Sequence, residues 1–300
     1  MEKSYFLSGC SGAEVFLKLE CQQVMKAFKI RGAFNKLLSL TEDEKKRGIM
    51  AASSGNHGAS VSYAASCLDI NLAKIYVPKT TPESKKQKIL RYGAELVLAG
   101  RNYDETYKIA KIAQKSHNLT WIDSCSDKHV IAGQGTVGLE ILDKIPDIDV
   151  ILVPIGGGSL ITGVSVAAKA KNPDIRIIGV QTEACPAMLA SMNENNFYEA
   201  YPSKPSVCEA LIGGVGEIPY QMAKQCIDEV LLVREDTIKE AVVSLLENDK
   251  VLAEPSAAVG AALLMENGKR FKGKKVAVVI SGANIDIEFL KTLLGGEQGE

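Results

Sequence analysis

The sequence predicts an α/β fold with parallel sheets, arranged as two domains. Eight short runs are apolar and rich in β-branched residues, which is typical of strands buried on both faces of a parallel sheet. Helix-length segments with apolar residues every three or four positions lie between most of these runs. This alternation of strand and helix indicates βαβ units.

The expected elements follow one another along the chain. The strands are expected over 15–20, 48–53, 73–78, 94–99, 150–155, 176–181, 229–233 and 275–280. Among the intervening segments, 105–116 and 237–249 have the spacing of amphipathic helices. A helix is also expected over 160–171, and another begins near Lys29.

The strands fall into two groups, and we therefore expect two domains. The large domain is expected to comprise residues 1–47 and 129–300, and the small domain residues 48–128. No Gly/Ser-rich or Pro-rich linker separates the two groups, so the join near 120–130 is expected to be a compact hinge. Clefts between domains commonly bind small ligands.

Composition excludes several classes of protein. Of the 300 residues 46% are hydrophobic and 24% are charged, and 35 Lys and Arg balance 36 Asp and Glu. Because there is no basic excess, we expect no nucleic-acid partner. No apolar run reaches the roughly 18 residues of a membrane span, and the opening MEKSYFLSGC lacks the apolar core of a signal peptide. The sequence therefore predicts a cytoplasmic protein with no membrane partner.

The cysteines and histidines do not form a metal-binding pattern. The seven cysteines are scattered and never spaced as CxxC, so we interpret them as reduced thiols. The three histidines, His57, His117 and His129, stand at no zinc-binding spacing. We expect no metal site.

A run of three glycines follows the strand expected over 150–155. Gly156, Gly157 and Gly158, with Ser159 and Leu160, join that strand to a helix. Consecutive glycines allow backbone N–H groups to converge at a helix N-terminus, where a phosphate can bind. The run is neither a Walker A motif nor GxGxxG, and a tight strand-to-helix turn explains it about as well.

A second strand-to-helix turn is Ser53-Ser54-Gly55-Asn56-His57-Gly58. Its Ser and Asn side chains could simply cap the helix. The functional interpretation is a nest of N–H and hydroxyl groups that binds a carboxylate. In that case we expect His57 to shape the loop rather than to act as a base.

Lys29 stands at the front of an amphipathic helix, in the context Ala27-Phe28-Lys29. A lysine at such a position is usually solvated, but one held against apolar neighbours can lose its charge and form a Schiff base. Two further turns, Glu254-Pro255-Ser256-Ala257 and Ser281-Gly282-Ala283-Asn284, could be plain turns or caps. We expect all these turns at the carboxyl ends of strands, where open α/β sheets bind ligands.

These motifs, in this order, resemble those of the fold-type II enzymes that use pyridoxal 5′-phosphate (PLP). The resemblance is to the threonine/serine dehydratase and serine racemase group, and it covers nearly the whole chain, including VIAGQGTVGLEIL over 130–142. It implies PLP as the cofactor and two doubly wound domains of the tryptophan synthase β type. It also implies a homo-oligomer, a dimer or a tetramer, and a small hydroxy amino-acid substrate.

The resemblance implies a role for each motif. Lys29 would form the Schiff base with Phe28 beside the ring, Asn56 would bond the cofactor's 3′-oxygen, and Ser281 would pair with the ring nitrogen. The implied cofactor-binding residues are Phe28, Lys29, Asn56, Gly156, Gly157, Gly158, Ser159, Leu160, Glu254 and Ser281. The residues implied for the substrate carboxylate are Ser53, Ser54, Gly55, Asn56 and His57.

Some positions depart from the family's pattern. Ala27 stands where the family usually has Ser, and Ser159 replaces a fourth glycine. One lost hydrogen bond should weaken cofactor binding by about 1–2 kcal/mol. Gln181 and Ala187 stand where metal-binding racemases carry acidic ligands, so that cation site is not expected here. The chain also begins later than the family's pattern, so a leading segment is expected to be reduced.

Two activities remain open within the family. Elimination to a 2-oxo acid and ammonia needs only Lys29 to take the Cα proton, whereas racemisation needs a second acid/base, a role that the resemblance gives to Ser54. The similarity of FKIRGAFNKLLSLTEDEK and IIGVQTE to catabolic threonine dehydratases favours elimination. The predicted function is an L-threonine/L-serine dehydratase. The alternatives are a serine or other amino-acid racemase, or a catalytically idle PLP-binding or nucleotide-binding protein.

Overall fold

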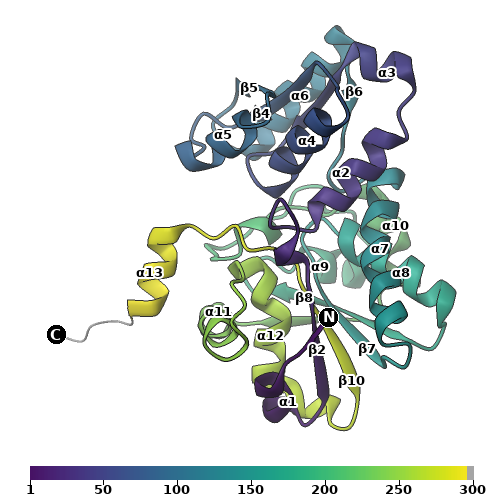
Figure 1. Cartoon of the computed structure of the whole chain (residues 1–300), viewed down its shortest axis with the longest axis vertical. Helices are drawn as coiled ribbons and strands as arrows, with labels where there is room; N and C mark the ends of the chain where they lie inside the picture. Colours follow the sequence, from purple (N-terminus) through teal and green to yellow (C-terminus); the bar gives the residue numbers. More distant parts are fainter. Residues whose placement is uncertain (296–300) are drawn as a thin grey trace. The chain divides into compact units, whose positions relative to one another are not determined.

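The computed structural model describes residues 1–295, except for the side chain of Asp104, and it divides into two compact units (Figure 1). The larger unit comprises Met1–Phe28 and the chain from Gln134 onward, and the smaller unit comprises Lys29–Gly133. The predicted α/β class is confirmed by the strands and helices of both units. The predicted domain boundaries at 47/48 and 128/129 remain a prediction.

The larger unit contains a six-stranded sheet in the order β1-β2-β10-β7-β8-β9. Its strands are β1 Glu2–Lys3, β2 Glu14–Leu19, β7 Val150–Pro154, β8 Arg176–Thr182, β9 Glu229–Val233 and β10 Lys275–Ile280. All pairs are parallel except β1 with β2. Ile280 at the end of β10 lies opposite Leu19 at the end of β2, so these carboxyl ends meet at one edge of the sheet.

Helices cover both faces of this sheet, as the alternation of side chains along β10 shows. Val276, Val278 and Ile280 belong to one core with residues of α11 and α12, and Ala277 and Val279 belong to another with residues of α7 and α8. The helices of the larger unit are α1 Tyr5–Ser11, α8 Ser159–Lys171, α9 Ala187–Glu194, α10 Glu217–Cys226, α11 Glu235–Asp249, α12 Pro255–Asn267 and α13 Ile287–Gly295. Helix α7, Lys128–Lys144, runs from the smaller unit into the larger one.

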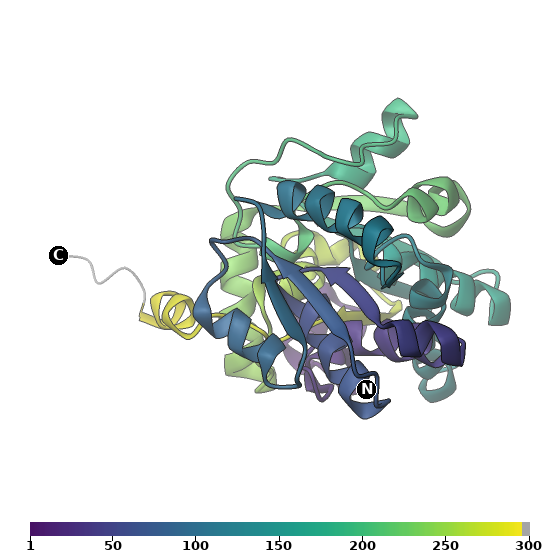
Figure 2. The same ribbon diagram turned by 90° about the horizontal axis from the view of Figure 1, so that it is seen from above.

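The smaller unit contains a four-stranded parallel sheet in the order β5-β4-β3-β6. Its strands are β3 Ile49–Ala52, β4 Ala73–Val77, β5 Glu95–Leu98 and β6 Thr120–Trp121, and its helices are α2 Lys29–Leu38, α3 Glu42–Arg47, α4 Asn56–Cys67, α5 Glu83–Leu90 and α6 Tyr103–His117. Tyr76 packs in a core with Ala110 of α6, whereas its neighbour Ile75 faces Gly58 of α4. Helices α4 and α6 therefore cover opposite faces of the sheet, which is seen from above in Figure 2.

The expectation that every apolar run is buried on both faces is wrong for β5 and β9. Both are edge strands, with a neighbour on one side only. Leu98 of β5 is 47% exposed, and three of the five residues of β9 are only half-buried. Strands β1 and β6 were not predicted, because two residues are too few to show a periodicity.

Two further observations concern the helices and the cysteines. None of the helices in the described part of the chain is long and apolar enough to cross a membrane. All seven cysteines are free thiols, as the scattered spacing indicated.

Candidate active site

The turn between β3 and α4 holds the residues predicted to bind a carboxylate. The Ser53 N–H donates to the Tyr76 carbonyl at 3.0 Å, and the Ser53 hydroxyl accepts from the Gly55 N–H at 3.2 Å. A Cβ on Gly58 would lie 2.2 Å from the Ser53 carbonyl oxygen, so only glycine fits there. The turn therefore places Ser53, Ser54 and Gly55 directly before the first N–H groups of α4, an arrangement that suits an anion.

His57 ties this turn to the segment that follows β6. The ring is 3% exposed, and Nε2 donates to the Ile122 carbonyl at 3.0 Å. Burial, with a smaller contribution from the positive charge of Lys29, lowers the pKa of His57 to about 4. The ring is therefore neutral near pH 7, and because Nε2 carries the proton, Nδ1 is an acceptor. This geometry agrees with a role in shaping the loop.

The buried neutral ring should make stability depend on pH. The pKa of His57 is lowered in the folded chain, so the unfolded chain binds the proton first as the pH falls from about 6.5 towards about 4. The stabilising contribution is present above that range and is lost as the pH falls through it. Between about pH 7 and about pH 5 the loss should be about 2 kcal/mol of the free energy of unfolding.

We expect His57→Gln to keep a donor for the Ile122 carbonyl and to lose this contribution. Urea unfolding at the two pH values measures the difference, and His117→Gln, at an exposed histidine, should behave like the wild type. An equal loss of stability in wild type and His57→Gln would show that His57 does not titrate as described.

Lys29 is the first residue of α2, and its side chain reaches the same segment after β6. Its Nζ donates to the carbonyl of Ser124 at 3.2 Å. Lys36, two turns further along the helix, forms an ion pair of 2.7 Å with Asp127. The predicted start of a helix at Lys29 is confirmed, and Ser124, in the segment after β6, contacts this lysine side chain.

The glycine run lies between β7 and α8 in the larger unit. Gly158, at the N-cap of α8, has φ +94°, and a Cβ there would lie 2.6 Å from Cβ of Pro219. A Cβ on Gly156 would lie 2.9 Å from the Ala210 carbonyl oxygen. Since Gly158 has no side chain to cap α8 and the first turn of α8 has no acidic residue, the N–H groups of Ser159 and Leu160 are suited to a phosphate.

Ser281 follows β10 and is joined to the chain that precedes Lys29. Its carbonyl accepts from the Phe28 N–H at 3.0 Å, and the next residue, Gly282, forms a β-bridge with Ala27. Ser281 is 5% exposed. Because Lys29 follows Phe28 directly in the chain, these bonds fix where the backbone of Lys29 begins.

Glu254 supports the same turn. Its N–H donates to the Gly282 carbonyl at 3.0 Å, and its carboxylate accepts from the Asn284 N–H at 2.9 Å. The expectation that Glu254 stands at the carboxyl end of a strand is wrong, because this residue caps α12 after a short segment that leaves α11.

Gln181 is fully buried at the end of β8, and its amide links three segments. Nε2 donates to the carbonyls of Ile155 and Cys185 at 3.4 and 3.3 Å, and Oε1 accepts from the Leu189 N–H at 3.1 Å. The side chain thus holds the residue before the glycine run against α9. Within residues 1–295 no group of three or more His, Cys, Asp or Glu side chains is placed to hold a metal ion.

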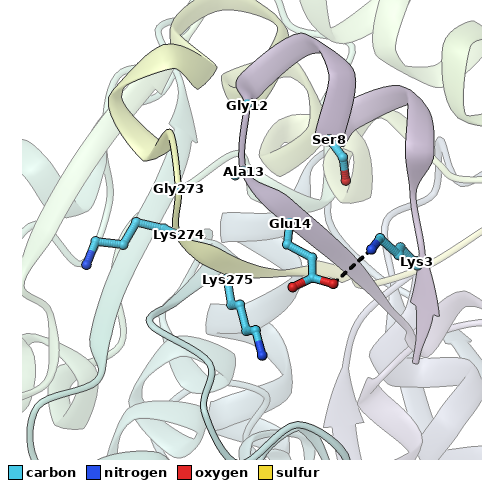
Figure 3. A pocket seen from close by; sticks show the side chains of 8 residues that line it. All are labelled: Lys3, Ser8, Gly12, Ala13, Glu14, Gly273, Lys274 and Lys275. Carbon is cyan, nitrogen blue, oxygen red and sulfur yellow. Dashed lines mark hydrogen bonds and ion pairs between the residues drawn. The ribbon is translucent and has the colours of Figure 1, made fainter.

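A cavity of about 370 Å³ lies elsewhere in the larger unit, where β2 and β10 begin (Figure 3). Its lining residues are Lys3, Ser8, Gly12, Ala13, Glu14, Gly273, Lys274 and Lys275. Lys3 pairs with Glu14 at 2.8 Å, and Lys275 pairs with Asp147. None of the predicted site residues lines this cavity, and each of its three lysines is paired with a carboxylate, so we do not assign the active site to it.

Sequence reasoning missed the residues that surround the Lys29 side chain. Ser124 contributes a main-chain carbonyl, which leaves no mark in the sequence. Asp123 accepts hydrogen bonds from the N–H groups of Cys125 and Ser126. The signal that could have revealed it is Asp followed by Ser within a short loop, which is typical of an Asx turn.

The residues present fit the predicted cofactor. Within the smaller unit, the primary amine at the front of α2 suits an aldehyde. Within the larger unit, the glycine turn before α8 suits a phosphate, and the neutral hydroxyl after β10 suits a ring nitrogen. Parallel sheets covered by helices, with such turns after their strands, are typical of α/β enzymes that bind a phosphate-bearing cofactor.

The comparison with protein families identifies the particular family. Residues 1–282 match the family described as pyridoxal-phosphate dependent enzyme, and the chain belongs to this family. PLP is therefore its cofactor, as predicted.

Individual relatives agree with this assignment. An L-threonine ammonia-lyase of Thermotoga maritima is 43% identical over 292 residues, which cover 97% of this chain and 72% of the relative. The structure of maize serine racemase has a TM-score of 0.91 at 32% identity and covers 98% of this chain and 90% of the racemase. A processed threonine deaminase isoform 2 from Solanum lycopersicum has a TM-score of 0.92 at 31% identity, with 98% and 86% of the two chains covered. The predicted resemblance to the threonine/serine dehydratase and serine racemase group is confirmed.

Proposed function

We propose that the protein is a PLP-dependent L-threonine/L-serine ammonia-lyase, which converts its substrate into a 2-oxo acid and ammonia by β-elimination. The observation that carries the proposal is the 43% identity, over 97% of this chain, with an L-threonine ammonia-lyase. The substrate is a small amino acid with a β-hydroxyl group. The protein acts in the cytoplasm as a homo-oligomer, a dimer or a tetramer.

Different residues have different roles in the elimination. When bound, PLP supplies the electron sink that eases loss of the Cα proton. Lys29 carries the cofactor through its amine, and in the reaction Nζ takes the Cα proton. The turn from Ser53 to His57 holds the substrate carboxylate, and orients the Cα–H bond towards the base.

The remaining residues hold and tune the cofactor. The glycine run, with Ser159 and Leu160, binds the phosphate through main-chain N–H groups, while Phe28 lies beside the ring and Asn56 bonds the 3′-oxygen. Ser281 offers the ring nitrogen a neutral hydroxyl group rather than a carboxylate, which favours elimination over transamination. Glu254 acts through the turn that carries Ser281, since its carboxylate bonds the Asn284 N–H.

A racemase is the second candidate, and Ser54 is the residue that favours it. Racemisation needs a proton donor on the face opposite Lys29, a role that the resemblance gives to Ser54 in the turn after β3. The similarity to maize serine racemase supports the same candidate. The hydroxyl also has a structural alternative, because serine at a helix start can satisfy backbone N–H groups at a value of about 1 kcal/mol.

Replacing Ser54 by alanine distinguishes the two activities. For a lyase, Ser54→Ala should leave 2-oxo acid formation from L-threonine or L-serine within about tenfold of the wild type. D-serine should be negligible in both proteins, measured by chiral chromatography alongside the 2-oxo acid. Ser66→Ala, at an exposed serine of α4, is the matched control. Abundant D-serine from the wild type that disappears in Ser54→Ala would replace the lyase with the racemase.

A further inference from the structure

Asp123 organises the loop that receives the side chain of Lys29. We propose that Asp123 is a positioning residue for Lys29: it folds the segment Asp123–Ser126 into a turn that presents the Ser124 carbonyl to Lys29 Nζ. The inference rests on the proposed role of Lys29 as the base. Asp123 belongs neither to the glycine-containing motifs nor to the turn predicted to bind the carboxylate.

The Asp123 carboxylate makes the hydrogen bonds that define this turn. Oδ1 accepts from the N–H groups of Cys125 at 2.8 Å and Ser126 at 2.7 Å. This is the pattern of an Asx turn, in which the side chain replaces a backbone acceptor. Oδ2 accepts from Trp121 Nε1 at 3.1 Å and from the Tyr107 hydroxyl at 3.5 Å. The carboxylate is thus held from two elements while it holds the loop.

The carboxylate is ionised in this setting. Burial raises the pKa of Asp123, but the N–H groups of Ser126 and Cys125 and the indole N–H outweigh burial and leave the pKa below its usual value. Hydrogen bonds to a charged acceptor are stronger than those between neutral groups. An ionised carboxylate has no donor of its own, so both of its oxygens can accept these bonds.

The residues on either side of the turn are also fixed. The Ile122 N–H donates to the Met50 carbonyl at 2.8 Å, and the Ile122 carbonyl accepts from His57 at 3.0 Å. At the other end, Asp127 pairs with Lys36 at 2.7 Å. Both ends of the segment are thus held, with the Asx turn between them, and Lys29 Nζ lies 3.2 Å from the Ser124 carbonyl oxygen.

This carbonyl is suited to a lysine that has just accepted a proton. In the elimination the Cα–H bond breaks, its electron pair forms the Cα–Cβ double bond, and the β-hydroxyl leaves with the electron pair of its own bond. The proton goes to the lone pair of Nζ. An ammonium donates a stronger hydrogen bond to a carbonyl than a neutral amine does, so Ser124 stabilises Lys29 after the transfer more than before it.

The test measures how fast Lys29 is acetylated by acetic anhydride in the full-length chain freed of cofactor. Peptide mass spectrometry gives the rate at Lys29 relative to the exposed Lys46. Asp123→Ala removes the acceptor of the turn, so the hydrogen bond from Lys29 Nζ to the Ser124 carbonyl should be lost. The relative rate of acetylation at Lys29 should then rise about fivefold. Asp123→Asn keeps a side-chain oxygen for the two N–H groups, and the rate should stay within about twofold of the wild type. Asp43→Asn, at an exposed aspartate of α3, should change nothing.

A third variant covers the case in which Asp123→Ala does not fold. The hydroxyl of Asp123→Ser can cap one N–H group at most, so its rate should exceed that of Asp123→Asn. Circular dichroism, compared with that of the wild type, reports whether each variant is folded.

Two results would overturn the proposal: equal rates in all variants, or equally raised rates in Asp123→Asn and Asp123→Ala. The second of these would mean that the charge of Asp123 acts and not the turn. Because acetylation needs neither cofactor nor turnover, this outcome is independent of the lyase proposal, which fails only if the wild type forms no 2-oxo acid.

Discussion

Replacing Lys29 by alanine should abolish the borohydride-reducible attachment of PLP and lower 2-oxo acid formation by at least about a thousandfold. The physical reason is that one amine carries the cofactor and also takes the Cα proton. The phosphate site proposed at the start of α8 does not include Lys29, so the variant should still bind PLP reversibly. Absorbance before and after borohydride treatment, followed by peptide mass spectrometry, measures the attachment.

Lys46→Ala provides the control for this experiment, since Lys46 is an exposed lysine of the same unit. It should keep both the reducible attachment and the activity of the wild type. If the reduced cofactor of the wild type were found on a lysine other than Lys29, the assignment of the site would be wrong.

Gly158→Ala should destabilise the fold and release the cofactor. Alanine at φ +94° costs about 1–2 kcal/mol of conformational energy. Its Cβ would also lie 2.6 Å from Pro219 and 3.0 Å from Met188, and overpacking of this kind costs about 1–3 kcal/mol. The sum predicts a loss of about 2–5 kcal/mol in the free energy of unfolding, measured with urea. Loss of PLP on dialysis should accompany it, because the clash displaces the first N–H groups of α8.

Gly273→Ala separates the two causes. Gly273 also has a positive φ, +76°, but a Cβ there would meet no atom within 4 Å. This variant should therefore lose only the conformational part, about 1–2 kcal/mol, and should keep PLP. Equal losses in the two variants would mean that the close packing around the glycine run has no importance for the cofactor.

Most of the strands could be predicted because burial leaves a direct mark on composition. The core strand β7 is apolar throughout, β10 is apolar after Lys275, and both lie between neighbours on both sides. The exposure of β5 and β9 could not be predicted, because position in a sheet depends on which strands pair, and a sequence pattern does not carry that information.

The candidate site could also be predicted only in part from the sequence. The glycine run and the turn after β3 were visible because positive φ values and close approaches require particular residues, as Gly158 and Gly58 show. The groups around the Lys29 side chain were not visible, since one of them is a main-chain carbonyl and Asp123 is an ordinary loop residue until its four donors are known. In the sequence, Gln181 was considered only because it stands where metal-binding racemases carry an acidic ligand. The structure shows that its amide forms hydrogen bonds with three segments.

The most direct test of the central claim is the balance of products that the purified protein, loaded with PLP, forms from L-threonine. Enzymatic assays of ammonia and of 2-oxobutanoate, with chiral analysis of the remaining amino acid, give that balance. A lyase that works by elimination at Lys29 should release the two products in equal amounts and leave no D-amino acid. Accumulation of D-amino acid without 2-oxobutanoate, or no turnover although PLP is bound, would contradict the account.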